Sequence, residues 1–164
     1  SELRRLSTTM TRSFLNSLFL IMPSLCFGAV DMHALADAVA IAESNNNPQA
    51  VGDSGKARGA YQMWRIAWDQ ANKVRKTEGM KQYPWSYAHD AYVSKQYALD
   101  YLRWCSSVLE AKLGRKPVYW EIYAAYARGP SSFAESDYSY HRLPERTHRA
   151  IKVIAAQMKE IPPR

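Results

Sequence analysis

The chain has 164 residues, of which 47% are hydrophobic and 23% are charged, so it is long enough to build one packed domain. Its 22 Lys and Arg against 15 Asp and Glu give a net charge of +7, which favours an anionic partner without specifying a fold. Two cysteines are too few for a disulfide scaffold or a zinc ribbon, and no internal repeat indicates a solenoid.

The first segment of the chain is typical of an export signal. Three arginines precede an apolar run over residues 14–29, and the small residues Gly28 and Ala29 end that run. Secretory signal peptides have a basic N-terminal region, a short apolar region and small residues at the cleavage site. We therefore expect residues 1–29 to be an N-terminal extension plus a signal peptide. The protein is then exported to the periplasm or cell envelope.

Details of this segment leave alternatives open. Met10 is the expected start of translation, with residues 1–9 upstream of it. The apolar run is broken by Pro23 and falls short of the roughly 20 residues that span a membrane, which disfavours an uncleaved anchor without excluding it. A lipoprotein site at Cys26 is disfavoured by the large Leu25 before it.

After the signal, the hydrophobic pattern predicts helices around one irregular loop. Asp31 is the predicted N-cap of a first helix, and glycine and proline breaks over residues 45–60 predict a loop, with a short hairpin as an option. Cys105 is expected to be a buried small hydrophobe. The prediction is a mostly α single domain over residues 30–164. Further helices are expected over residues 62–76, about 88–113, 118–127 and from Pro144 to before Pro162.

Glu43 is the candidate catalytic residue. It follows Val39 by four residues and Leu35 by eight, so it lies on the buried stripe of its helix. A carboxyl group in apolar surroundings has a raised pKa, which suits a general acid that works near neutral pH. On periodicity alone, an ordinary half-exposed glutamate at a helix end remains the alternative.

Two motifs of the chain resemble those of a known family. Glu43-Ser44 is followed by Asn47-Pro48 and by Gly59-Ala60-Tyr61-Gln62, and a second motif reads Ala125-Tyr126-Ala127-Arg128-Gly129-Pro130. In order and spacing, over about residues 32–158, they resemble the soluble lytic transglycosylases, relatives of goose-type lysozyme. The resemblance implies a lysozyme-like fold, with helices around a catalytic cleft, and an enzyme that cleaves peptidoglycan.

The resemblance also implies roles for single residues. Glu43 would be the single acid/base. It would protonate the glycosidic oxygen between N-acetylmuramic acid (MurNAc) and N-acetylglucosamine (GlcNAc), then accept the proton of the MurNAc 6-hydroxyl, which leaves a 1,6-anhydro end. Ser44 and Gln62 would bind saccharide groups. Tyr61, next to Gln62, is the aromatic residue expected in the cleft, and Tyr126 would hold Glu43 or line the cleft.

The second motif departs from the family, whose Asn and Ala are Ala127 and Arg128 here. The change removes an amide donor and acceptor from the cleft. Arg128 would reach an anionic group of the substrate, such as the lactyl or a stem-peptide carboxylate. A solvated cation at the helix end is the alternative that its position favours.

A second carboxylate, Asp53, lies in a predicted turn, and an exposed turn residue is the favoured interpretation. If Asp53 reached the cleft, it would be placed to activate water and make the enzyme a hydrolase.

Other patterns argue against further classes of site. The four histidines show no metal-ligand spacing, so we predict no metal and no cofactor. The basic residues are dispersed and match no nucleic-acid-binding signature, so nucleic acid is not an expected partner. Contact with a membrane is expected only through the signal segment. Trp104 and Trp120 are expected in the core.

Three functions remain open. The first is a peptidoglycan lytic transglycosylase, whose small domain would suit opening a local gap in the wall for a secretion, pilus or conjugation machine. The second is a lysozyme-type muramidase that uses water on the same fold. The third is a catalytically inert peptidoglycan-binding or scaffold protein.

Overall fold

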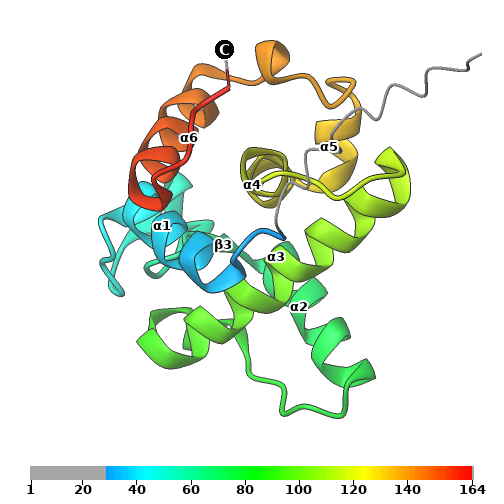
Figure 1. Cartoon of the computed structure of the whole chain (residues 1–164). Helices are drawn as coiled ribbons and strands as arrows, with labels where there is room; N and C mark the ends of the chain where they lie inside the picture. The colour runs from blue at the N-terminus through cyan, green and yellow to red at the C-terminus, as the bar shows by residue number, and fades with distance from the viewer. Residues whose placement is uncertain (1–28, 164) are drawn as a thin grey trace, which may run out of the picture.

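The computed structural model describes residues 29–163 (Figure 1). Apart from Ala29, the predicted extension and signal peptide, with Met10 and Cys26, lie outside the described residues. Among the helices that are described, none is long and apolar enough to cross a membrane.

The described residues confirm a mostly helical fold with one small sheet. Their α-helices are α1 (Met32–Ser44), α2 (Arg65–Thr77), α3 (Ala91–Leu113), α4 (Tyr119–Arg128), α5 (Pro130–Ala134) and α6 (Glu145–Met158). Between α1 and α2 lie the strands β1 (Val51–Gly52), β2 (Ala57–Arg58) and β3 (Met63–Trp64). Short 3₁₀ turns are η1 (Asp53–Gly55), η2 (Trp85–His89) and η3 (Tyr140–Arg142).

Local capping determines where α1 begins and where α1 and α3 end. The Asp31 carboxylate accepts hydrogen bonds from the backbone N–H groups of His33 and Ala34, at 2.9 and 3.1 Å. The chain leaves α1 through Asn45, whose φ of 55° is left-handed. Gly114 ends α3 in the same conformation, with a φ of 67°. The predicted start of the first helix and the predicted end of the long helix are therefore confirmed.

The segment predicted as a loop or short hairpin forms a three-stranded antiparallel sheet. β1 pairs with β2 and β2 pairs with β3, in that spatial order. Because β3 takes residues 63–64, α2 begins at Arg65 and not at the predicted residue 62. Gly59 lets this region pack against η2, since a Cβ at Gly59 would lie 1.8 Å from the backbone oxygen of Ala88. Its φ of +75° also favours glycine.

Two further helix boundaries differ from the predicted ones. Residues 85–89 form η2, so α3 starts at Ala91, where the Asp90 carboxylate accepts a hydrogen bond from the Val93 N–H at 2.8 Å. The predicted stop at Gly129-Pro130 does end α4. Pro130 also opens α5, which had no predicted counterpart, because proline suits the first turn of a helix.

Helix α4 runs through the middle of the domain, where Figure 1 shows it nearly end-on with other helices around it. It packs on α3, α5 and α6, while α1 packs on α3 and α6. From Tyr119 to Tyr126 it is buried except for Trp120, which is half-buried against the core, as is Trp104 of α3. Cys105 is buried as predicted, and burial raises the pKa of its thiol.

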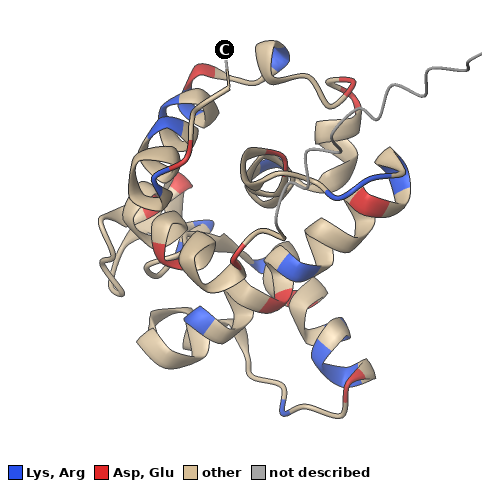
Figure 2. Ribbon diagram, viewed as in Figure 1, with Lys and Arg blue, Asp and Glu red and all other residues tan. Residues whose placement is uncertain are grey.

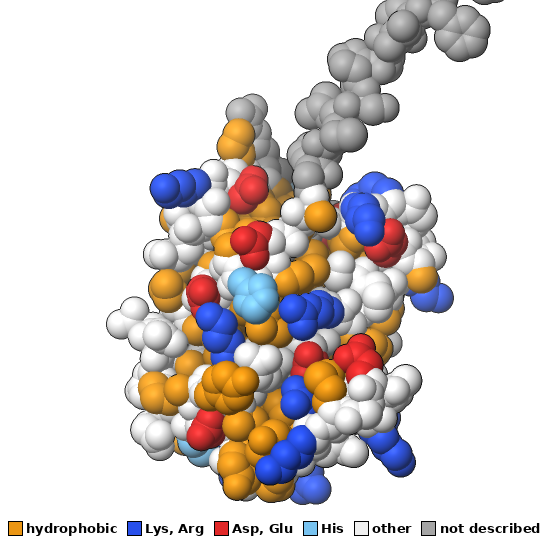
Figure 3. All heavy atoms as spheres, turned by 60° about the horizontal axis from the view of Figure 1, so that its bottom comes forward, with side chains coloured by type: hydrophobic (Ala, Val, Ile, Leu, Met, Phe, Trp, Pro, Cys, Tyr) orange, Lys and Arg blue, Asp and Glu red, His pale blue; other side chains and the backbone are white. Residues whose placement is uncertain are grey.

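Charged side chains of both signs are spread over the helices (Figure 2). On the face shown in Figure 3, Lys and Arg side chains are mixed with acidic, polar and hydrophobic ones. The excess of basic residues therefore does not form a single patch on that face, in line with the dispersed charges of the sequence.

Candidate active site

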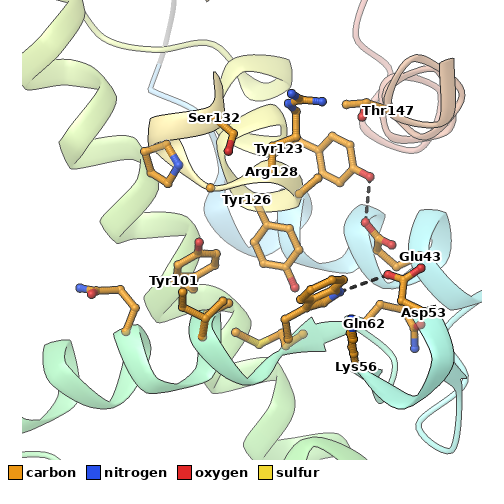
Figure 4. A pocket seen from close by; sticks show the side chains of 18 of the residues that line it. Glu43, Asp53, Lys56, Gln62, Tyr101, Tyr123, Tyr126, Arg128, Ser132 and Thr147 are labelled. Atoms are coloured by element: carbon orange, nitrogen blue, oxygen red, sulfur yellow. Dashed lines mark hydrogen bonds between the residues drawn. The ribbon is translucent and has the colours of Figure 1, made fainter. Parts of the chain in front are cut away.

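A cleft of about 1170 Å³ is lined by the η1 turn, β3 and α2 on one side and by α4, α5 and α6 on the other. Tyr101 and Trp104 of α3 also line it. The volume exceeds the roughly 300–1,000 Å³ of an ordinary small-molecule site, so the cleft suits an extended ligand such as a polymer. Figure 4 shows this lining, with Glu43 and Asp53 at one end of it.

Glu43 lies in the last turn of α1, and its side chain is only 11% exposed. The Tyr123 hydroxyl donates a hydrogen bond to Glu43 Oε1 at 2.8 Å (Figure 4), and Arg146 Nη2 lies 4.0 Å from Oε2. Burial is the largest influence and raises the pKa of Glu43. The Tyr123 hydrogen bond and the Arg146 charge oppose that rise, and the Asp53 charge adds to it. The net shift is upward, as predicted, and keeps the carboxyl protonated closer to neutral pH.

Ser44, for which the family resemblance implied a saccharide contact, ties the segment after α1 to the sheet region instead. Its hydroxyl donates to the backbone oxygen of Ala60 at 2.8 Å and accepts the Asn47 N–H at 3.0 Å. Ser44 is not among the described residues that line the cleft. Its hydrogen bonds therefore hold the turn that follows Glu43, so its contribution to the site is indirect.

Asp53 is an exposed residue of the η1 turn, as interpreted, and it also lines the cleft. Its side chain is 31% exposed, and both oxygens accept hydrogen bonds: Oδ1 from Arg146 at 3.0 Å and Oδ2 from the Trp64 indole at 3.1 Å. The Arg146 hydrogen bond is the main cause of a lowered pKa for Asp53. One end of the cleft thus holds two carboxyl groups whose pKa values are shifted in opposite directions.

Gln62, also expected to bind saccharide, lines the cleft. Its φ of 46° is left-handed, which is uncommon for a residue with a side chain, and its Nε2 donates to the backbone oxygen of Gly59 at 2.9 Å. A Cβ at Gly52 would come within 2.2 Å of Gln62 Oε1. Gly52 therefore makes room for the Gln62 side chain at the cleft wall.

The two tyrosines expected at the cleft lie differently. Tyr61 is 4% exposed and belongs to the core, and it is absent from the described lining of the cleft. Burial raises its pKa to about 12. Tyr126 does line the cleft, but its hydroxyl donates to the backbone oxygen of Tyr61 at 2.7 Å and not to Glu43. Tyr61 is therefore not the cleft residue that was expected. Its ring packs in the core, while the side chain of its neighbour Gln62 faces the cleft.

The hydroxyl that contacts Glu43 belongs to Tyr123, which had no predicted role in the site. Tyr123 precedes Tyr126 by three residues, so the two rings share one face of α4. Burial and the charge of Glu43 keep the pKa of Tyr123 well above its ordinary value, so it remains a hydrogen-bond donor. Helical spacing from Tyr126 was the sequence signal that could have identified it.

Arg128 lines the same side of the cleft as the last residue of α4. It is half-buried, and its Nε is buried without a hydrogen-bond partner in the part of the chain that the structure describes. A freely solvated helix-end cation, which its position favoured, does not describe this arginine. Ala127, which replaces the family's Asn, also lines the cleft and is exposed.

Arg146 and Trp64 complete this end of the cleft, and neither had a predicted role in it. Arg146 lies in the first turn of α6, 93 positions after Asp53, so no local pattern could connect the two. Trp64 is 44% exposed and, with the exposed Ile66, adds apolar surface to the cleft. Aromatic surface of this kind suits the apolar faces of sugar rings.

The arrangement suits the cleavage of glycosidic bonds. A buried carboxyl with a raised pKa faces a cleft large enough for a polymer, and it can give a proton to a leaving oxygen. Over residues 29–163, the structure places no three His, Cys, Asp or Glu side chains together in a way that could hold a metal ion.

Comparison with known families agrees with this geometry. The model of the family described as "Transglycosylase SLT domain" matches residues 30–148, which include Glu43, the sheet, α4 and Arg146. A search of the curated proteins found no match. The family match confirms the resemblance and, since it covers more than half of the chain, the protein belongs to the transglycosylase SLT domain family, a family of transglycosylases that act on peptidoglycan.

Proposed function

We propose that this protein is a lytic transglycosylase that cleaves the bond between MurNAc and GlcNAc in peptidoglycan and leaves 1,6-anhydro-MurNAc ends. The observation that carries the proposal is the Glu43 carboxyl, which is 11% exposed, has a raised pKa and is held by Tyr123 at the end of a polymer-sized cleft. Membership of the transglycosylase SLT domain family supports it.

In the first step, protonated Glu43 donates its proton to the glycosidic oxygen. The bond from the MurNAc anomeric carbon to that oxygen breaks, and GlcNAc leaves with a new hydroxyl group. Positive charge develops at the anomeric carbon, where the substrate's own acetamido group can support it. The Tyr123 hydroxyl stabilises the Glu43 carboxylate as it forms, because it already donates to Oε1 at 2.8 Å.

In the second step, the Glu43 carboxylate accepts the proton of the MurNAc 6-hydroxyl. The oxygen of that hydroxyl bonds to the anomeric carbon and closes the 1,6-anhydro ring, so no water is consumed and Glu43 is protonated again. The nucleophile belongs to the same sugar, which gives it the advantage of an intramolecular reaction. A second protein carboxylate is therefore not needed.

Other cleft residues bind the glycan strand in this proposal. Gln62 offers its amide to saccharide groups beside the cleaved bond, and Trp64 offers an exposed ring face. Arg128 pairs with a lactyl or stem-peptide carboxylate, supported by its place in the lining and by its unpartnered buried Nε among the described residues. Tyr126 lines the cleft, while Ser44 and Tyr61 act from behind it.

A second candidate is a lysozyme-type muramidase, in which water attacks the anomeric carbon. The observation in its favour is that the Asp53 carboxylate lies on the cleft beside Glu43, and paired carboxylates of this kind activate water in inverting glycosidases.

The place of action is also part of the proposal. The basic and apolar character of residues 1–29 supports export to the periplasm or cell envelope. There the enzyme would open local gaps in the wall for a secretion, pilus or conjugation machine. Deletion of the gene should then impair the assembly of such a machine, and normal assembly of every envelope-spanning machine would contradict this role.

The decisive experiment is a digest of purified peptidoglycan by the protein and by its Glu43→Gln variant, with the products identified by mass spectrometry. Glu145→Gln is a matched control, because Glu145 is 82% exposed and pairs with Arg149. We expect anhydro-muropeptides from the wild type and from Glu145→Gln, and none from Glu43→Gln. Reducing-end products would establish the muramidase instead. Binding to the wall without any release would indicate an inert binding protein.

A further inference from the structure

Three charged groups from distant parts of the chain meet at one end of the cleft. Glu43 comes from the end of α1, Asp53 from η1 and Arg146 from the first turn of α6. The Arg146 guanidinium lies between the two carboxylates, with Nη1 3.0 Å from Asp53 Oδ1 and Nη2 4.0 Å from Glu43 Oε2. The contact with Asp53 is a hydrogen bond, whereas the contact with Glu43 is a longer ion pair without a hydrogen bond.

Asp53 is poorly suited to act as a base in this arrangement. Arg146 donates to one of its oxygens and the Trp64 indole donates to the other. Lys56, which lies on the same cleft, adds a further positive charge near it, and Asp53 holds its proton less tightly than an ordinary aspartate. A carboxylate that activates water must accept a proton from it. Each of these contacts stabilises the ionised carboxylate and so lowers its affinity for that proton.

We propose that Arg146 is a positioning residue that takes Asp53 as its counter-ion and so leaves Glu43 weakly paired as the single acid/base of the cleft. This inference rests on the proposed function, and it gives Asp53 a role other than the activation of water. The hydrogen bond to Asp53 keeps the Arg146 guanidinium from pairing closely with Glu43. The same hydrogen bond takes up one oxygen of the Asp53 carboxylate.

The groups that face Glu43 make the inference testable. They are the Tyr123 hydroxyl from α4, Arg146 from α6 and Asp53 from η1. The buried Tyr126 of α4 is also close enough for the charge of Glu43 to raise its pKa. Arg146 lowers the pKa of Glu43 and Asp53 raises it. The Arg146 side chain is 65% exposed, so solvent screens its charge and the loss of one group changes the balance without abolishing the site.

Two substitutions should therefore shift the pH dependence in opposite directions. In Asp53→Asn, the negative charge is lost and Arg146 is free to approach Glu43, so the pKa of Glu43 falls and the alkaline limb of kcat/KM moves to lower pH. In Arg146→Met, the cation is lost, so the pKa of Glu43 rises and the alkaline limb moves to higher pH. The double variant restores the local charge balance, and its limb should lie between those of the single variants.

Arg149→Met is the matched control for Arg146→Met. Arg149 lies one turn further along α6, is also 65% exposed and pairs with Glu145 instead of a cleft residue. It should leave the pH profile unchanged. The titration of Glu43 should also be followed by 13C NMR of the carboxyl carbon, with its signal assigned by its loss in Glu43→Gln. This measurement does not depend on turnover and should show the same opposite shifts.

Product analysis separates this inference from its rival. Asp53→Asn should still release anhydro-muropeptides. If Asp53→Asn abolished product release while the titration of Glu43 stayed unchanged, Asp53 would act directly in the chemistry and the inference would be overturned. Single variants that only lowered the rate at every pH would also overturn it, because a merely structural role predicts that result. If the wild type released no product, the proposed function would fail, and the NMR titration would still decide the role of Arg146.

Discussion

In the part of the chain that the structure describes, Glu121 is buried and Glu43 is largely buried, and each lies near an arginine. The two differ in the number of donors that reach the carboxylate. Glu121, in the first turn of α4, is 3% exposed, and Arg115 donates to both of its oxygens at 2.9 and 2.6 Å. The Val118 N–H adds a third hydrogen bond at 2.9 Å. Glu43 is 11% exposed and receives one hydrogen bond, from Tyr123. Its nearest cation stays 4.0 Å away.

The difference supports the separate roles that we propose for the two carboxylates. A buried charge that is fully hydrogen-bonded stabilises the local structure, here the start of α4. A buried carboxyl with too few donors gains from holding a proton, and that proton is then available for catalysis. Burial alone therefore does not distinguish the two glutamates, whereas the number of donors to each carboxylate does.

The largest expected effect is on activity. Glu43→Gln removes the proposed proton donor and should lower kcat/KM on peptidoglycan by roughly 10³-fold, within the range for loss of a general acid. Release of soluble muropeptides measures it. Glu121→Gln should keep most of the activity in whatever fraction of the protein is folded. Equal losses in the two variants would remove the functional distinction between the glutamates.

The next effect is on stability. Here we expect the larger loss from substitution of Glu121, whereas for activity we expect it from substitution of Glu43. Glu121→Ala removes three hydrogen bonds from the start of α4 and should lower the free energy of unfolding by about 2–3 kcal/mol. The cost stays below that of a fully buried pair because Arg115 is 54% exposed and can be solvated when left alone. Urea unfolding measures the change, and a loss below 0.5 kcal/mol, which is about the scatter of surface substitutions, would contradict it.

Tyr123→Phe tests the single donor of Glu43. The variant loses the hydrogen bond at 2.8 Å while keeping the ring, so we expect kcat to fall by about tenfold. Because that hydrogen bond lowers the pKa of Glu43, its loss should also move the alkaline limb of the pH profile to higher pH. Tyr119→Phe, which removes a hydroxyl bound to the backbone oxygen of Ile161 away from the cleft, is the control and should leave the profile unchanged.

The smallest effect is a pH-dependent gain in stability. Folding raises the pKa of Glu43, so its contribution to stability is fully present below the pKa of the unfolded chain and is lost as pH rises through the folded value. Glu43→Gln, which cannot ionise, should therefore be more stable than the wild type at pH 8 by about 1 kcal/mol, with the gap closing near pH 4. Thermal unfolding across this range measures it. A gap that widened toward acid pH would mean that the pKa of Glu43 is lowered instead.

Several features of the fold could be predicted because short stretches of chain determine them. Asp31 reaches N–H groups two and three residues away, and the four- and eight-residue spacings to Val39 and Leu35 place Glu43 on a buried stripe. The predicted start of α2 at residue 62 was wrong for a different reason. β3 takes the residues before Arg65 because they pair with β2, and such pairing depends on the partner strand.

By itself, the sequence determined the helical class, the family motifs and the choice of Glu43, because these follow from hydrophobic period, caps and local spacing. Only the tertiary structure decided which groups surround that acid. Tyr123 lies 80 positions after Glu43, and Arg146 lies 93 positions after Asp53, so these contacts exist only once α4 and α6 have packed around the cleft. The same packing places the Tyr61 ring in the core and Asp53 on the cleft. Electrostatics acts through space, so the partners that shift the pKa of Glu43 come from elements that no local pattern connects.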